Sequence, residues 1–422
     1  MIVELINTGS ELMLGRVLNT HQQWLCRRLA DMGYVVSRQV AVPDTASDIE
    51  QAVREALSRA DIIITTGGLG PTSDDITRDL IAKLLGRTLH EDAAALAHIR
   101  HFFEVRNRPM PARTALQAQV PDGATVLQNP NGTAPGLAME LDPNPFRPGR
   151  EKSLLIMLPG PPRELRPMFI DTVAPLLNRA MPITDSFVCR TWRTTGIGES
   201  LVEEKIGSLL QPLVGRGLEL GYCARPGEVD VRLAARQAGA AELVAEAEII
   251  VRAQLEPHLF TVEEEELEAT VVRLLTGRKE TLALAESCTG GCIAHRLTNV
   301  PGASNVFLAG FVTYSNLAKH KFLGVQESTL AGHGAVSEPV AREMAEGARA
   351  QACSDYALSV TGIAGPSGAT PGKPVGTVFI GLAGPFPTLV LRSFNPFDRE
   401  TFKNVTAQQA MDLLRRRIQK GL

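Results

Sequence analysis

Residues 281–291 read Thr281-Leu-Ala-Leu-Ala-Glu-Ser-Cys-Thr-Gly-Gly291, an apolar run that ends in a polar, glycine-rich turn before a helical pattern. This order of strand, turn and helix is typical of an α/β fold. It places the Ser287 hydroxyl and a row of free backbone N–H groups at a helix N-terminus, which can hold an anion or a developing oxyanion. Ser287 can act as a nucleophile if a base lies nearby. Lys319, which ends Val312-Thr-Tyr-Ser-Asn-Leu-Ala-Lys319, is the candidate.

Both residues also have simpler interpretations. Ser287 fits an N-cap on a structural turn, and Lys319 fits a surface lysine. The chain lacks the Gly-x-Ser-x-Gly elbow of an α/β-hydrolase, and its histidines in this region offer no obvious base. A Ser–Lys pair needs no histidine, because a desolvated lysine can be neutral near pH 7.

The N-terminal part, residues 1–170, alternates short aliphatic strands with amphipathic helices, which predicts a parallel sheet covered by helices on both faces. Residues 142–152 form a Pro- and Arg-rich excursion that we interpret as a hairpin loop within this domain. Residues 171–262 predict a small α+β module. Its Gly196-Ile-Gly-Glu199 lacks the Gly-x-x-Gly spacing of an RNA clamp, so we expect a spacer or dimerisation role and no direct nucleic-acid binding.

Residues 263–422 predict a second α/β domain, with candidate strands at 282–285, 356–360 and 375–382. If its sheet is parallel, the loops 286–291, 361–366 and 368–374 meet at one edge. The fold class is therefore α/β: two three-layer α/β domains joined by the small α+β module.

Glycines and acidic residues follow the N-terminal strand that ends at Thr66. Gly67, Gly68 and Gly70 allow backbone to approach a phosphate, and Thr72 adds a hydroxyl. The aspartates that follow, Asp74, Asp75 and Asp79, offer the oxygen ligands that a divalent cation prefers. The alternative reading, tight-turn glycines and helix-capping aspartates, is equally compatible with composition.

Composition excludes several classes of protein. The chain of 422 residues is 44% hydrophobic and 21% charged, with a net charge of −3, which gives no electrostatic argument for nucleic-acid or membrane binding. Met1-Ile-Val-Glu-Leu-Ile-Asn7 begins as a strand and not as a signal peptide, and the six cysteines are scattered, so we expect a cytoplasmic protein with reduced thiols. The basic run 415–417 is interpreted as a solvated helix end.

Several motifs together resemble the full-length CinA (competence/damage-inducible) family over nearly the whole chain. The N-terminal domain resembles the molybdopterin-biosynthesis fold through Gly67-Gly-Leu-Gly-Pro-Thr-Ser-Asp-Asp75, Asn131-Gly-Thr-Ala-Pro-Gly136 and Leu158-Pro-Gly-Pro-Pro-Arg-Glu-Leu165. The C-terminal domain resembles nicotinamide-nucleotide amidases through Ala285-Glu-Ser-Cys-Thr-Gly-Gly291, Gly310-Phe-Val-Thr-Tyr-Ser-Asn316, Gly334-Ala-Val-Ser-Glu-Pro339, Thr361-Gly-Ile-Ala-Gly-Pro366 and Lys373-Pro-Val-Gly-Thr377.

The C-terminal resemblance implies hydrolysis of nicotinamide mononucleotide to nicotinate mononucleotide and ammonia, without a cofactor. Ser287 matches the nucleophile and Lys319 its base, while Tyr314 and Thr361 match polar site residues and Arg399 matches a phosphate-site arginine. The remaining positions expected to bind substrate lie in the same motifs: Glu286, Thr289, Gly290, Gly291 and Gly362. Phe397 and Lys403 depart from the family pattern near this arginine.

The N-terminal resemblance implies metal-dependent cleavage of a pyrophosphate, with ADP-ribose as the type of substrate. Asp75, Asp79 and Glu11 are the expected ligands of a divalent cation of unknown identity. His21 stands where the family usually has asparagine. A homodimer is the default expectation. Two alternatives stay open: an accessory protein of DNA uptake whose sites bind nucleotides without turnover, and a molybdopterin-handling enzyme, which rests on fold analogy alone.

Overall fold

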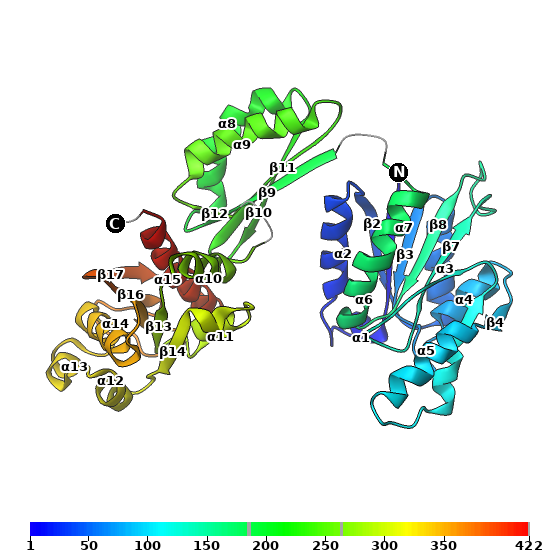
Figure 1. Ribbon diagram of the computed structural model, residues 1–422. Helices are drawn as coiled ribbons and strands as arrows, with labels where there is room; N and C mark the ends of the chain where they lie inside the picture. The colour runs from blue at the N-terminus through cyan, green and yellow to red at the C-terminus, as the bar shows by residue number, and fades with distance from the viewer. Residues whose placement is uncertain (184–186, 262–264, 421–422) are drawn as a thin grey trace. The chain divides into compact units, whose positions relative to one another are not determined.

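The computed structural model describes residues 1–183, 187–261 and 265–420. The chain divides into two compact units, 1–186 and 187–422, and the second contains both the small module and the C-terminal domain. Figure 1 labels most of their helices and strands. Within the described part of the chain, we find no helix with the length and apolar character that crossing a bilayer requires.

The N-terminal unit is built on a six-stranded sheet of order β2-β1-β3-β8-β7-β6. The strands β2, β1, β3 and β8 are mutually parallel, whereas β7 runs antiparallel to both of its neighbours, β8 and β6. The sheet is therefore mixed and not wholly parallel as predicted, because residues 142–152 return the chain as the expected hairpin between β7 and β8. The bounds are β1 Val3–Thr8, β2 Val36–Val42, β3 Ile62–Thr66, β6 Thr125–Leu127, β7 Gly136–Leu141 and β8 Ser153–Leu158.

Helices cover both faces of this sheet. The helices α2 Thr20–Asp31, α6 Pro162–Met168 and α7 Ala174–Ala180, with the π-helical η2 Phe169–Val173, pack on one face, and α3 Ala46–Leu57 and α4 Thr77–Leu84 on the other. The unit extends beyond the expected boundary at residue 170, because Val173, Leu176 and Leu177 are buried in its core. The remaining elements are α1 Ser10–Met13, β4 Leu89–Glu91, α5 Ala93–Glu104, η1 Ala112–Ala118 and β5 Gln119–Pro121.

The small module, residues 187–261, is α+β as predicted. Its antiparallel sheet has the order β10-β11-β9-β12, and two long helices pack on one face through alternating residues such as Val229, Val231 and Leu233. The bounds are β9 Phe187–Thr195, α8 Glu199–Val214, β10 Leu218–Arg225, β11 Glu228–Arg236, α9 Ala240–Leu255 and β12 Leu259–Thr261.

The C-terminal domain has a five-stranded sheet of order β14-β13-β15-β16-β17 between two helical layers. Figure 1 shows α12, α13 and α14 on one side and α10, α11 and α15 on the other. The bounds are α10 Leu267–Arg278, β13 Leu282–Glu286, α11 Cys292–Thr298, η3 Ala303–Asn305, β14 Phe307–Val312, α12 Asn316–Leu323, α13 Glu327–His333, α14 Glu338–Ala352, β15 Tyr356–Gly362, β16 Thr377–Gly384, β17 Phe386–Phe394 and α15 Arg399–Lys420.

This second sheet is also mixed. Strands β14, β13 and β15 are parallel, but β16 runs antiparallel to both of its neighbours, β15 and β17. The three predicted loops still meet at one edge, because an antiparallel β16 begins where β15 ends, with Gly362 opposite Val378. The proposed α/β class, with two three-layer domains and an intervening module, is therefore confirmed, while the strand directions differ from the expectation.

The basic run near the C-terminus is not simply a solvated helix end. Arg415 is 1% exposed. Its guanidinium donates to the carbonyl oxygens of Leu259 at 2.7 Å and Pro257 at 3.0 Å, and it pairs with Asp412 at 2.6 Å. Because arginine offers five donors in a planar fork, this one side chain ties α15 to the module within the second unit.

Candidate active sites

Ser287 and Lys319 meet at the edge of the C-terminal sheet. Ser287 directly follows β13, and Lys319 lies in α12, whose Ser315 N-cap accepts a hydrogen bond from the Ala318 N–H. The Lys319 Nζ lies 3.0 Å from the Ser287 Oγ and donates to the Thr313 carbonyl oxygen at 2.8 Å. Ser287 is 8% exposed and Lys319 1%. The alternative interpretation of Lys319 as a surface lysine is therefore excluded.

The surroundings of Lys319 favour its uncharged form. Burial lowers the pKa of Lys319, because the ammonium loses its hydration. The neighbouring Cys288 supplies no counter-charge near neutral pH, since burial raises the pKa of its thiol to about 12. A neutral amine that donates one N–H to the Thr313 carbonyl can direct its lone pair at the Ser287 hydroxyl. This is the arrangement that a serine nucleophile needs from its base.

Glu286 does not present its carboxylate to a substrate. Its Oε2 accepts hydrogen bonds from the N–H groups of Gly291 at 3.0 Å and Ile293 at 3.1 Å, and its Oε1 accepts from Ala294 at 2.8 Å. The expected row of free N–H groups at this helix is thus occupied by the strand residue that precedes Ser287. Glu286 therefore fixes the turn and α11, and is not a direct substrate ligand.

Two N–H groups of the turn remain. In the described part of the chain, those of Cys288 and Thr289 donate to no oxygen. The Thr289 hydroxyl is buried and has no hydrogen-bond partner among the described residues. Gly290 and Gly291 adopt φ of 61° and 93°, a region that glycine enters without a steric cost. The turn thus retains donors beside the Ser287 hydroxyl.

Glu286→Gln should destabilise the protein measurably. A carboxamide has one acceptor oxygen in place of two and brings an NH2 group toward backbone donors. We expect the free energy of unfolding to fall by about 1–3 kcal/mol, as measured by urea unfolding. Glu338→Gln is the matched control, because that carboxylate lies in the first turn of α14 but is 58% exposed. Equal stability of the two variants would contradict the capping role.

Tyr314 and Arg399 come together, although they are far apart in the sequence. The Arg399 Nη2 donates to the Tyr314 Oη at 2.7 Å, and its Nη1 donates to the Gly365 carbonyl oxygen at 2.9 Å. Both acceptors are uncharged, so neither neutralises the guanidinium. Arg399 also opens α15, and a helix N-terminus adds positive potential. The pair can therefore bind an anionic group.

Thr361 and Gly362 shape the end of β15. The Thr361 hydroxyl is buried and donates to the Ala335 carbonyl oxygen at 2.8 Å. A Cβ on Gly362 would lie 2.9 Å from the Thr377 carbonyl oxygen and 3.1 Å from the Phe402 ring, so only glycine fits. The carbonyl of Thr313, which orients Lys319, was not predicted; a backbone group leaves no signal in the sequence.

The N-terminal unit contains a cavity of about 390 Å³ at the carboxyl ends of β1 and β3. Its wall combines backbone from Gly67, Gly68 and Gly70 with acidic side chains. Gly67 has a φ of 97°, and a Cβ there would lie 2.8 Å from the Thr8 carbonyl oxygen. The acidic residues of the wall are Glu11, Asp44, Asp74, Asp75 and Glu164. Among the described residues that line this cavity there is no lysine or arginine.

The predicted metal ligands are only partly brought together. Glu11 and Asp75 line the cavity, but Asp79 pairs with Arg78 at 2.6 Å and Thr72 also lies outside the lining. Asp75 accepts a hydrogen bond from the Thr72 N–H at 2.9 Å, so Thr72 acts by holding this carboxylate. Across the described residues, no three His, Cys, Asp or Glu side chains converge in a manner suited to a metal ion.

Sequence reasoning missed three residues of this wall, Asp44, Gln117 and Glu164. Glu164 lies within the motif 158–165, which could have identified it, whereas Asp44 and Gln117 follow no glycine-rich signal. Burial raises the pKa of Glu164, and the hydrogen bond that its carboxylate accepts from Asn129 at 2.8 Å opposes this shift. The unusual His21 bonds through its ring to the carbonyl oxygen of Gly160, which belongs to the wall.

Three family models match the chain in order. Residues 4–179 match "Probable molybdopterin binding domain", residues 189–261 match "Damage-inducible protein CinA KH domain", and residues 264–418 match "CinA C-terminal domain". The middle match gives the module a family name that its missing Gly-x-x-Gly spacing did not indicate. Absence of direct nucleic-acid binding remains a prediction.

Similar proteins span the whole chain. A "Putative competence-damage inducible protein" from Caldicellulosiruptor bescii is 42% identical over 421 residues, which cover 99% of both chains. A "CinA-like protein" from Akkermansia muciniphila is 44% identical, over 97% of this chain and 95% of that protein. A solved CinA superfamily protein from Klebsiella pneumoniae is 34% identical over 36% of this chain and 96% of its own, with a TM-score of 0.36. The chain therefore belongs to the CinA family of competence/damage-inducible proteins.

Proposed function

We propose that the C-terminal domain hydrolyses the carboxamide of nicotinamide mononucleotide to nicotinate mononucleotide and ammonia. The observation that carries this proposal is the buried Lys319 amine 3.0 Å from the Ser287 hydroxyl. An amide carbonyl requires a nucleophile, donors for its oxyanion and a proton for the leaving nitrogen. Ser287, the N–H groups of Cys288 and Thr289, and Lys319 supply these three functions.

The reaction proceeds in two halves. Lys319 takes the Ser287 proton as Oγ attacks the carbonyl carbon, and the oxyanion faces the N–H groups of the turn. The Lys319 ammonium then gives that proton to the leaving nitrogen, so ammonia departs and a nicotinoyl ester of Ser287 remains. Water attacks this ester with Lys319 again as base, and the proton returns to Ser287 as nicotinate forms.

Arg399 is the proposed partner of the substrate 5′-phosphate. Its guanidinium is held by the Tyr314 hydroxyl and the Gly365 carbonyl, which are neutral, so its charge is available to an anion. The Tyr314 ring is 61% exposed, and its position beside Arg399 lets it contact the ribose or pyridine portion.

We propose that the N-terminal cavity cleaves the pyrophosphate of ADP-ribose with a divalent cation. The carboxylates of its wall fit the oxygen donors that Mg²⁺ or Mn²⁺ prefers, and Glu11 and Asp75 would hold the ion. When bound, the ion would neutralise the negative charge of the phosphates, because the acidic wall of the cavity has no lysine or arginine among its described residues to do so. Because the described residues bring no three such side chains together, Glu11 and Asp75 would hold the ion only with further oxygen ligands. Because Gly67, Gly68 and Gly70 have no side chains, the phosphates can approach their backbone closely.

Chelation should separate the two activities. EDTA or Asp75→Ala should reduce AMP release from ADP-ribose by at least about 100-fold, because an uncompensated acidic wall repels a pyrophosphate. Ammonia release from nicotinamide mononucleotide should stay within about twofold. Chromatography of nucleotides and an ammonia assay measure both reactions on one sample. Asp79→Ala is the matched control, since Asp79 pairs with Arg78 outside the cavity.

Other outcomes of this experiment have defined meanings. Equal loss of both activities in Asp75→Ala would indicate misfolding. Binding of ADP-ribose without turnover at any metal concentration would favour the alternative function, a nucleotide-binding accessory role in competence. The similarity to competence-damage inducible proteins is the observation that favours it.

A further inference from the structure

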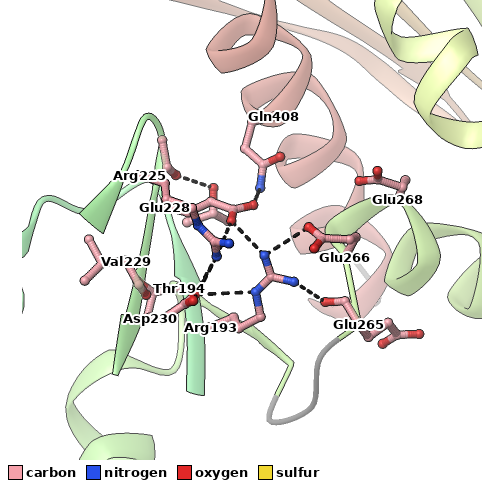
Figure 2. Close-up of polar contacts among 12 residues, drawn as sticks. Arg193, Thr194, Arg225, Glu228, Val229, Asp230, Glu265, Glu266, Glu268 and Gln408 are labelled. Carbon is pink, nitrogen blue, oxygen red and sulfur yellow. Dashed lines mark hydrogen bonds and ion pairs between the residues drawn. The ribbon is translucent and has the colours of Figure 1, made fainter. Parts of the chain in front are cut away.

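A network of charged residues joins the small module to the C-terminal domain within the second unit (Figure 2). Arg193 on β9 is 4% exposed. Its Nη2 lies 3.0 Å from Glu228 Oε2 on β11 and 2.9 Å from Glu266 Oε2, and its Nε lies 3.4 Å from Asp230. Arg193 also donates to the Glu265 carbonyl oxygen at 3.0 Å. The module is thus bonded to the segment that leads into α10.

Gln408 of α15 extends this network toward the amidase site. Its Nε2 donates to Glu228 Oε1, as Figure 2 shows, and its Oε1 accepts from Arg296 Nη2 at 2.7 Å. Arg296 lies in α11 and pairs with Glu268 of α10 at 2.6 Å. One carboxamide therefore connects a carboxylate of the module with a guanidinium of α11.

The two helices that meet at Gln408 are those that begin at the proposed site. The helix α11 follows the Ser287 turn, and Glu286 caps its first N–H groups. The helix α15 begins at Arg399, the proposed phosphate partner. A shift of either helix would displace the nucleophile turn relative to the arginine, and sub-ångström placement decides the rate of such reactions.

Only a carboxamide satisfies both neighbours of Gln408. It is 3% exposed, so water cannot replace a lost hydrogen bond. Glutamate at this position would still accept from Arg296 but would repel Glu228, and an apolar residue would remove the hydrogen bond that each group makes with position 408. Arg415 adds a second attachment of α15 to the module through the carbonyl oxygens of Leu259 and Pro257.

We propose that Gln408 is a positioning residue through which the small module aligns α11 and α15 for amide hydrolysis. This inference rests on the proposed amidase function and adds a role for the module in it. The module thereby acts as part of the amidase framework, in addition to any role in linking domains or copies of the chain.

The test uses a donor–acceptor swap in the full chain. Gln408→Glu should lower kcat for nicotinamide mononucleotide about tenfold, since a buried hydrogen bond is replaced by a repulsion. The double variant Gln408→Glu with Glu228→Gln should recover to within about threefold of wild type. There the new carboxamide at 228 donates to the new carboxylate at 408, which still accepts from Arg296.

Two controls separate positioning from folding. Arg216→Gln removes a 2.6 Å ion pair with Glu246 on the exposed side of the module and should leave kcat unchanged. Amide hydrogen exchange should rise in α11 but not in α14 in Gln408→Glu and return in the double variant, whereas a general loss of stability would raise exchange in both helices.

Wild-type kcat in Gln408→Glu, or a double variant no better than the worse single variant, would overturn the inference while leaving the amidase intact. Absence of ammonia release from the wild-type protein would overturn the proposed function and this inference together.

Discussion

Ser287→Ala is expected to lower ammonia release from nicotinamide mononucleotide by at least about 10³-fold. The variant removes the oxygen that forms the ester in the proposed reaction, which lies 3.0 Å from the Lys319 amine. The residual rate would come from binding and the oxyanion donors alone. An ammonia assay at saturating substrate measures the effect.

The same protein contains its own control for this experiment. Cleavage of ADP-ribose by the N-terminal cavity should be unchanged in Ser287→Ala, because Ser287 belongs to the other compact unit. Ser304 is an exposed serine within η3, and the Ser304→Ala variant should retain both activities. Mass spectrometry of quenched wild-type enzyme should reveal a nicotinoyl adduct on the peptide with Ser287. Full ammonia release by Ser287→Ala would refute the nucleophile assignment.

Lys319→Met is expected to lower the same reaction by about 10²–10⁴-fold, the usual contribution of a positioned base and acid. Methionine keeps the unbranched shape of the side chain but has no lone pair for the Ser287 proton and no proton for ammonia. Lys319→Arg should be equally inactive, because a guanidinium stays charged. Leu317→Met, an exposed position in the same helix, is the control.

The pH dependence follows from the lowered pKa of Lys319. The reaction needs the neutral amine, so kcat/KM of the wild type should fall as pH decreases through this pKa. The unfolded chain binds a proton to this lysine up to a higher pH than the folded chain does. Stability should therefore rise with pH between the folded and unfolded pKa values, and Lys319→Met should remove this part of the slope. Identical pH–stability curves for wild type and variant would contradict the buried neutral amine.

Local patterns predicted the elements that carry the chemistry. The apolar run before Ser287 and the helical pattern after it predicted a strand, a turn and a helix, and β13 and α11 confirm them. Lys319 could be proposed as the partner of Ser287 from residue chemistry and the family motifs. Their contact then depended on the parallel pairing of β13 with β14, which brings the segment before α12 beside the turn.

The roles of residues whose partners are set by the tertiary fold could not be predicted in this way. Glu286 was expected to bind substrate, but the first turn of α11 folds back onto its carboxylate. Asp79 was expected at a metal, but its helical position directs it to Arg78. Arg415 was expected in solvent, yet the packing of α15 on the module buries it. In each case the residue type was compatible with two environments.

By itself, the sequence determined the α/β class and the presence of a module between two domains, and it offered Ser287 and Lys319 as a candidate pair, because hydrophobic periodicity, glycine turns and motif order are local properties of the chain. Only the tertiary structure decided the mixed strand directions, the capping by Glu286, the acidic cavity wall and the Gln408 bridge. These features depend on which distant groups face one another, and a buried polar group acquires its function from the partner that satisfies its hydrogen bonds.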